Sequence, residues 1–205
     1  MRPKTWTYTP EAANSTGFLS NATGATFTLT ATTPDDGLAH IVIFDPDGTA
    51  DLSAITVALT GTDADGRAQT ETITLTNGGG TTSSTKFFKT LTLAVPSATI
   101  GAETVDIGWT AAAVGPTIPV NWRANPFELT LSTDISGTIN FDVEYTSQDI
   151  WTSQPSTLLW SNHATIAAKT ADTDGSTTVP IRAVRLAVNS VTASATLSLT
   201  VIQGG

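Results

Sequence analysis

Hydrophobic and polar residues alternate along most of the chain. The clearest stretch runs from Ala25 to Ala31, where threonines occupy every second position between apolar residues. Alternation with a period of two places one set of side chains on each face of an extended strand. The pattern predicts an all-β protein that presents a large, hydroxyl-rich surface.

Further runs of this kind predict a series of short strands. They lie at residues 26–31, 38–44, 54–60, 67–76, 86–95, 103–110, 127–131, 139–145, 182–188 and 195–201. Asp63-Ala64-Asp65-Gly66 predicts a tight hairpin turn between two of them, because glycine tolerates a positive φ. Helical periodicity is not sustained anywhere. Short strands at this spacing indicate antiparallel β-sandwich or jelly-roll-like folds.

A change in composition divides the chain. Pro116, Pro119 and Pro126 interrupt the alternating pattern, and such a break is typical of a boundary between domains. We therefore predict two small sandwich domains in tandem, at 25–113 and 127–205, joined by a linker at 114–126. Residues 1–24 are expected to form an N-terminal arm or an edge strand.

Four aromatic side chains are candidates for contact with a partner. Trp6 and Tyr8 lie in the N-terminal segment, where an arm could dock on another subunit. Trp151 and Trp160 lie in an irregular stretch, 147–166, and long irregular segments often make contacts. Three interpretations of these two tryptophans stay open: plugs at the end of the second core, interface anchors, and a platform for a ligand.

The low charge content also favours assembly. Only 13% of residues are charged, about half the usual quarter, so hydroxyl and amide groups must cover much of the surface. A hydroxyl costs far less to dehydrate than an ion, and such a surface can be buried against a neighbour. The net charge of −9 argues against nucleic acid as a partner, because phosphate contacts need clustered cations.

The sequence also bears on location. It contains no cysteine, so disulfides cannot contribute to stability. Residues 1–6 lack the apolar run of a signal peptide, and no stretch approaches the 18 apolar residues that indicate a membrane span. We expect synthesis in a cytoplasm, without export by the usual route and without a membrane partner.

Three Asp-x-Asp-Gly motifs raise the question of calcium. They begin at Asp45, Asp63 and Asp172, and paired carboxylates before a turn glycine can open a calcium loop. The twelfth positions, counted from each first aspartate, are Thr56, Thr74 and Ala183. None is the carboxylate that a complete loop needs. The motifs are interpreted as turns, no metal or other cofactor is predicted, and Asp45, Asp47 and Asp51 form the least unfavourable cluster.

Candidate catalytic groups are few. The two histidines, His40 and His163, are accompanied by no nucleophile elbow, phosphate loop or set of metal ligands. A triad could still assemble in space, because its geometry does not depend on sequence position. We nevertheless predict a protein that is not an enzyme and has no catalytic residues.

Two long stretches carry recurrent turn and strand motifs. Residues 55–109 contain Thr60–Gly66, Thr72–Thr74 and Ser84–Thr90. Residues 126–203, with Asn125 directly before them, contain Asn125–Phe127, Ser136–Ile139, Asp142–Thr146, Ala171–Gly175, Ile181–Leu186 and Leu199–Gln203. With these motifs, both stretches resemble small β modules in structural proteins of tailed bacteriophages. The resemblance covers more than half of the chain. It implies a multi-copy virion component, without catalytic residues, that is synthesised in the host cytoplasm.

The main hypothesis is therefore a head decoration (cement) protein. It would stabilise the particle through lateral contacts with copies of itself and with the major capsid protein. A tail or head–tail connector component, with the corresponding partners, is the alternative within the same class. A receptor- or glycan-binding module that uses Trp151 and Trp160 is the alternative outside it.

Overall fold

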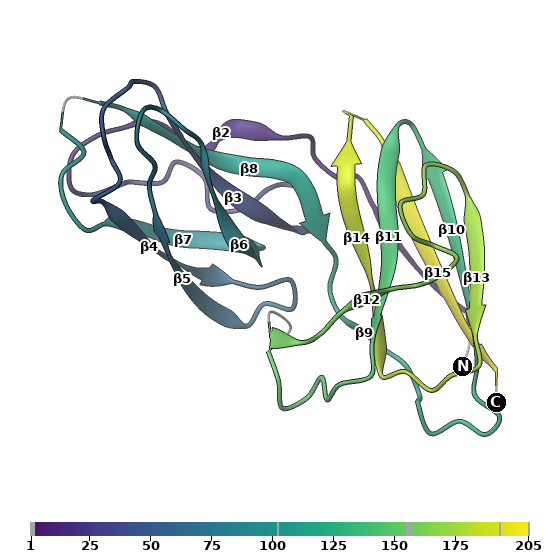
Figure 1. The fold of residues 1–205 in the computed structure, drawn as a ribbon. Coiled ribbons are helices and arrows are strands. Elements are labelled where there is room, and N and C mark those ends of the chain that lie inside the picture. The colour runs from purple at the N-terminus through teal and green to yellow at the C-terminus, as the bar shows by residue number, and fades with distance from the viewer. Residues whose placement is uncertain (1–2, 102, 155–156, 193, 205) are drawn as a thin grey trace. The chain divides into compact units, whose positions relative to one another are not determined.

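A computed structural model describes residues 3–101, 103–154, 157–192 and 194–204. Over these residues the chain forms fifteen strands and no α-helix (Figure 1), so the all-β prediction is confirmed. Within the same ranges, no helix has the length and hydropathy needed to cross a membrane. The chain divides into two compact units, one spanning Ala13–Ala111 and the other combining Met1–Ala12 with Ala112–Gly205.

The unit Ala13–Ala111, here called the first sandwich, has two sheets (Figure 1). One contains β2 (Asn14–Ala22), β8 (Val105–Val114), β3 (Ala39–Pro46) and β6 (Thr82–Phe88). The other has the order β5 (Ala68–Thr74), β4 (Thr56–Thr62), β7 (Thr90–Pro96). Phe18, Phe44 and Phe88 from the first sheet form one buried cluster with Leu59 and Leu91 from the second. Burial of these large side chains holds the two sheets together.

The other unit, here called the second sandwich, is built in the same way. One sheet has the order β1 (Lys4–Tyr8), β15 (Thr196–Gly204), β10 (Glu128–Ser136), β13 (Thr173–Thr177). The facing strands are β12 (Ser161–Asn162), β11 (Ile139–Thr146) and β14 (Ala183–Val191), with the short β9 (Ile118–Pro119) and the end of β8 beside β14. Buried side chains alternate along β10 and β15, where they include Leu131 and Leu199, and are nearly continuous along parts of β11 and β14, where they include Phe141 and Leu186; together they supply the core.

The clearest alternating stretch, 26–31, is not a strand, and that prediction was wrong. Its burial does alternate, with Phe27 buried and its neighbours exposed. The backbone instead lies beside β2, where the amides of Thr30 and Ala31 both donate to the carbonyl oxygen of Phe18. Because both amides donate to the same oxygen, the regular series of backbone hydrogen bonds of a strand pair does not form. The segment is therefore an extended loop, and its Phe27 side chain packs in the core.

The predicted strand at 86–95 is two strands that belong to different sheets. It divides at Lys89: β6 pairs with β3, whereas β7 pairs with β4. The amide of Lys89 donates to the carbonyl oxygen of Thr62 at the division. The apolar residues on both sides, Phe88 and Leu91, point into the same core. The sequence pattern alone does not indicate this change of sheet.

Two N-terminal segments, 4–8 and 14–22, belong to regular sheets. Residues 14–22 form β2, in which Phe18 is fully buried and its ring lies 5.0 Å from that of Trp109. Residues 4–8 form β1, an edge strand that pairs with β15. The segment predicted as a linker, 114–126, contains the last residue of β8 and all of β9.

Candidate functional site

The outer face of the β5–β4–β7 sheet carries no charged residue over its central rows. Residues that pair directly across antiparallel strands share a face, and here Thr60 pairs with both Thr70 and Leu93, while Ala58 pairs with both Thr72 and Val95. We call this surface the uncharged face. Its members are Thr56, Ala58, Thr60, Thr70, Thr72, Thr74, Leu93 and Val95.

Two large aliphatic side chains of β7 are exposed on the uncharged face. Leu93 is 53% exposed and Val95 45%. The register of β7 against β4 shifts between Thr60 and Gly61. One extra residue in a strand reverses the orientation of the side chains beyond it. Leu91 therefore points into the core, while Leu93 and Val95 point outward.

The edge of the sheet beside these two residues is open. Over the described residues, β7 has β4 as its one strand partner, and β7 ends the sheet. The loop residue Thr32 accepts the amide of Leu91 at 2.8 Å and so covers the start of the edge. An uncovered edge presents backbone donors and acceptors to a further strand.

The absence of charge from this face contrasts with the rest of the first sandwich. Between residues 13 and 111 there are ten carboxylates and three cations, which gives a net charge of −7. Two of the carboxylates, Asp63 and Asp65, lie in the turn that joins β4 to β5. These two charges lie at the end of the sheet, and none of the paired residues that make up the uncharged face is charged.

Of the four aromatic candidates, Trp6 and Tyr8 lie together on β1. They pair with Leu199 and Leu197 of β15, which are buried, so both rings face the core side of their sheet. Both are half-buried, and burial raises the pKa of the Tyr8 phenol above its usual value. The ammonium group of Lys4 lies 4.8 Å from the centroid of the Trp6 ring.

Trp151 and Trp160 lie in different environments. Trp160 is half-buried against a small cluster of Ile150, Leu158 and Ala183, and the guanidinium of Arg185 lies 4.2 Å from its ring centroid. Trp151 is 72% exposed. It lines a pocket with Trp122 and two arginines, a group that sequence analysis missed.

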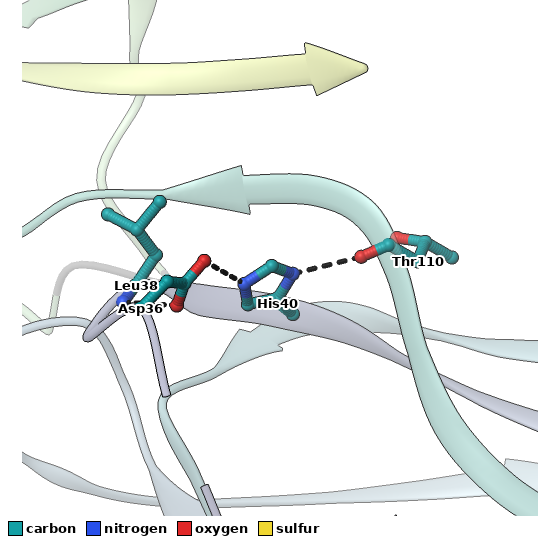
Figure 2. A network of polar contacts seen from close by, with 4 residues as sticks. All are labelled: Asp36, Leu38, His40 and Thr110. Carbon is teal, nitrogen blue, oxygen red and sulfur yellow. Dashed lines mark hydrogen bonds and ion pairs between the residues drawn. The ribbon is translucent and has the colours of Figure 1, made fainter. Parts of the chain in front are cut away.

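His40 is fully enclosed in the first sandwich. Figure 2 shows its ring between Asp36 and Thr110. Its Nε2 atom lies 2.9 Å from Oδ2 of Asp36, and Nδ1 lies 2.9 Å from the carbonyl oxygen of Thr110. Asp36 also accepts the amide of Leu38. Both ring nitrogens are thus occupied by protein partners, and the ring links the loop before β3 to β8.

His163 is buried in the second sandwich. Its Nδ1 accepts the amide of Thr165 at 3.3 Å, and its Nε2 lies 3.3 Å from the carbonyl oxygen of Ser176. A carbonyl only accepts, so the proton is on Nε2 and the ring is neutral in this arrangement. Gly175 packs so closely that an added Cβ would lie 2.6 Å from the ring. This histidine joins β13 to the loop before it.

Of the three Asp-x-Asp-Gly motifs, the one at 63–66 is a turn, between β4 and β5, as predicted. Asp45 and Pro46 end β3, and only the rest of that motif lies in a loop. The turn prediction was wrong for the motif that begins at Asp172, because its last three residues belong to β13 and Gly175 pairs with Leu131. Asp63 accepts the amides of Asp65 and Arg67 through one oxygen, and Gly66 follows with a φ of 78°. One oxygen of Asp172 accepts the amide of Ile135. Asp47 accepts the hydroxyl of Thr104. Over the described ranges, no three histidine, aspartate or glutamate side chains gather as a set of metal ligands.

Comparison with known proteins gives one weak likeness. No protein-family model matches the chain, and no curated protein matches it. Among solved structures, a phage protein described as the PBSX exported protein XepA is similar at a TM-score of 0.29 and 8% identity. The alignment covers 98% of this chain and 86% of that one. At this score the likeness carries no inference.

Proposed function

We propose that the protein is a non-enzymatic structural component of a tailed-phage virion, and specifically a head decoration protein. The class of particle comes from the resemblance of residues 55–109 and 126–203 to phage β modules. The mode of action comes from the uncharged face, which supports lateral contact between copies. The partners are copies of the same chain and the major capsid protein.

The observation that carries this proposal is the pair of exposed aliphatic residues, Leu93 and Val95, beside an open sheet edge. Burial of aliphatic side chains against a neighbour is favourable, at roughly 25 cal/mol for each Å² of apolar surface removed from water. The threonines around them cost little to dehydrate, and they form hydrogen bonds across a contact. The face therefore combines a hydrophobic strip along its open edge with a polar, uncharged surface beside it.

Charge restricts where two copies can meet. Each chain has a net charge of −9, most of it in the first sandwich. Like charges that face each other across a contact cost several kcal/mol, so a contact between copies is favoured where charge is absent. The uncharged face meets this condition. Pairing of β7 with β7 of a second copy would also satisfy the open backbone groups, because an antiparallel pair of identical strands has two-fold symmetry.

The test is to locate the protein in a particle. Phage particles purified from an infected host would be analysed by mass spectrometry and cryo-electron microscopy. The proposal expects many copies per particle, with density for two linked β-sandwiches on the outer surface of the head. If the copies are confined to the tail or neck, the protein is a tail or connector component and not a head decoration protein. Absence from intact particles would overturn the proposal.

A further inference from the structure

A pocket in the second sandwich combines exposed aromatic rings with cations. Its volume is about 360 Å³, and its wall includes Asn121, Trp122, Arg123, Ile150, Trp151 and Arg182. All of these residues belong to the same compact unit. Neither the proposed assembly role nor the uncharged face makes use of them.

Two arginines pack on one indole ring in this pocket. The guanidinium carbon of Arg182 lies 4.6 Å from the centroid of the Trp122 ring, and that of Arg123 lies 4.8 Å away. A guanidinium over an aromatic face is held by the ring quadrupole, while its N–H donors lie in its own plane and point outward. Trp122 thus orients two cationic donors, and it is itself 38% exposed.

Asp149 contacts two parts of the pocket wall. Its carboxylate accepts the amide of Trp151 at 3.1 Å and the hydroxyl of Thr152 at 3.0 Å, and it lies 3.7 Å from a guanidinium nitrogen of Arg182. The hydrogen bonds from Trp151 and Thr152, together with Arg182, hold the pKa of this carboxyl below its usual value. One carboxylate therefore caps the turn that carries Trp151 and also lies beside the guanidinium of Arg182.

The loop that carries Trp122 and Arg123 is also held in place. The buried Gln203 side chain accepts the amide of Asn121 at 2.8 Å and donates to its carbonyl oxygen at 2.7 Å. The amide of Val120 donates to the carbonyl oxygen of Arg182 at 3.0 Å. Groups that are ordered before a ligand arrives lose little entropy when it binds.

The pocket has a local positive charge in an acidic protein. Residues 112–205 contain four cations, and Arg123 and Arg182 are two of them. Asp149 offsets one of these charges, which leaves a net charge of +1 beside the exposed Trp151. Arginine binds carboxylates and phosphates through parallel N–H bonds. The exposed indole offers a flat apolar surface of the kind on which the C–H face of a sugar ring stacks.

We propose that this pocket binds an anionic saccharide. The sugar ring stacks on Trp151, and its carboxylate or phosphate group accepts hydrogen bonds from Arg123 and Arg182. A nucleic-acid strand fits the pocket less well, because a polyanion needs a track of cations and the chain as a whole carries a net charge of −9. The proposal is independent of assembly, so either role can fail while the other stands.

The test is calorimetric titration of the full chain with four probes. Trigalacturonic acid supplies carboxylates, and mannose 6-phosphate supplies a phosphate. Maltotriose is the neutral saccharide, and a short oligothymidylate represents nucleic acid. We expect saturable binding of at least one of the two anionic sugars, at least about 10-fold tighter than maltotriose, since a hydrogen bond to a charged group contributes about 1.5–3 kcal/mol. The sugar that binds identifies the anion.

Two variants and two matched controls locate the binding site. Arg123→Gln and Trp151→Ala should each weaken binding about 10-fold or more. Lys169→Gln removes one positive charge elsewhere in the same unit, and Leu159→Ala truncates another exposed apolar side chain; both should bind as the wild type does. Circular dichroism verifies that all four variants are folded. The proposal would be overturned if neither anionic sugar bound, if maltotriose bound equally well, or if only oligothymidylate bound. Unchanged affinity in either pocket variant would also overturn it.

Discussion

The Nε2 atom of His40 lies 2.9 Å from Oδ2 of Asp36, and both side chains are 0% exposed. The other ring nitrogen faces the carbonyl oxygen of Thr110, which can only accept, so Nδ1 carries a proton. A second proton must then lie between Nε2 and the carboxylate oxygen. Whichever atom holds this proton, each of the two buried side chains depends on the other for its hydrogen bond.

The loss of stability on replacement of Asp36 should therefore depend strongly on which residue replaces it. Asp36→Ala leaves Nε2 of His40 buried without its partner and should lower the free energy of unfolding by about 3–5 kcal/mol. Asp36→Asn should cost less, because a carboxamide can donate to a neutral Nε2 and still accept the amide of Leu38. Hydrogen exchange of β3 and β8 amides, followed by mass spectrometry, measures both. Equal losses of protection in the two variants would contradict this account.

Asp63 should make the first sandwich less stable at neutral pH than in mild acid. One oxygen accepts two amides, but Oδ2 is buried and has no partner over the described residues. Burial raises the pKa of this carboxyl above its usual value, despite the two amides. The folded protein thus holds the proton more strongly than the unfolded chain, and the stability from this group is lost as pH rises through the folded pKa.

Asp63→Asn tests the direction of this pH dependence of stability. The amide oxygen can still accept from Asp65 and Arg67, while the buried charge is removed. At pH 7 the variant should be more stable than the wild type by about 1 kcal/mol, and the difference should shrink toward pH 4, where an ordinary aspartate titrates. Thermal unfolding at several pH values measures it. A difference that stays constant with pH would show that charge is not the cause.

Alternation in the sequence proved a better guide to burial than to strand pairing. Residues 26–31 alternate in burial, yet their amides find no ladder, because two of them bond to the carbonyl oxygen of Phe18. Conversely, β2 was not predicted as a whole, since its Gly, Ser and Asn residues obscure the contribution of Phe18. Pairing depends on which backbone lies alongside, and one chain segment does not contain that information.

For the candidate sites, too, the local sequence indicates some features, whereas others depend on long-range contacts. A hydroxyl-rich face follows directly from the threonines of β5, but exposure of Leu93 and Val95 depends on a register shift in β7. The pocket brings together Trp122 and Arg182, which are far apart in the sequence. Sequence analysis singled out Trp151 of this pocket, from its irregular stretch, but not Trp122-Arg123, which lies between Pro119 and Pro126. A long-range contact cannot be inferred from either segment alone.

Gly17 should be indispensable to the packing of β2. An added Cβ would lie 2.0 Å from Cζ3 of Trp109, whose ring packs edge-on against Phe18. Gly17→Ala should therefore lower the free energy of unfolding by about 1–3 kcal/mol through overpacking. Urea denaturation measures it. In a double-mutant cycle, Trp109→Leu should cost less in the Gly17→Ala background than in the wild type, because the clash is relieved. Strictly additive effects would refute a direct contact.

Self-association should depend on Val95. Val95→Glu places a charge on the uncharged face, at its open edge, where burial against a second acidic copy would leave it without a partner. We expect the variant to associate at least about 10-fold more weakly than the wild type, because an unpaired buried charge costs well over 1 kcal/mol. Sedimentation-velocity centrifugation over a range of concentrations measures this change.

The matched control is Val179→Glu, the same substitution at a valine that is 67% exposed in the second sandwich. It alters the net charge equally. General repulsion between acidic chains therefore predicts the same weakening of self-association for both variants. Contact through the uncharged face predicts weakening for the Val95 variant alone. Leu93→Glu and Leu159→Glu repeat the comparison with leucine. Equal association of the two valine variants, or a strictly monomeric wild type at high concentration, would exclude the uncharged face as a contact between copies.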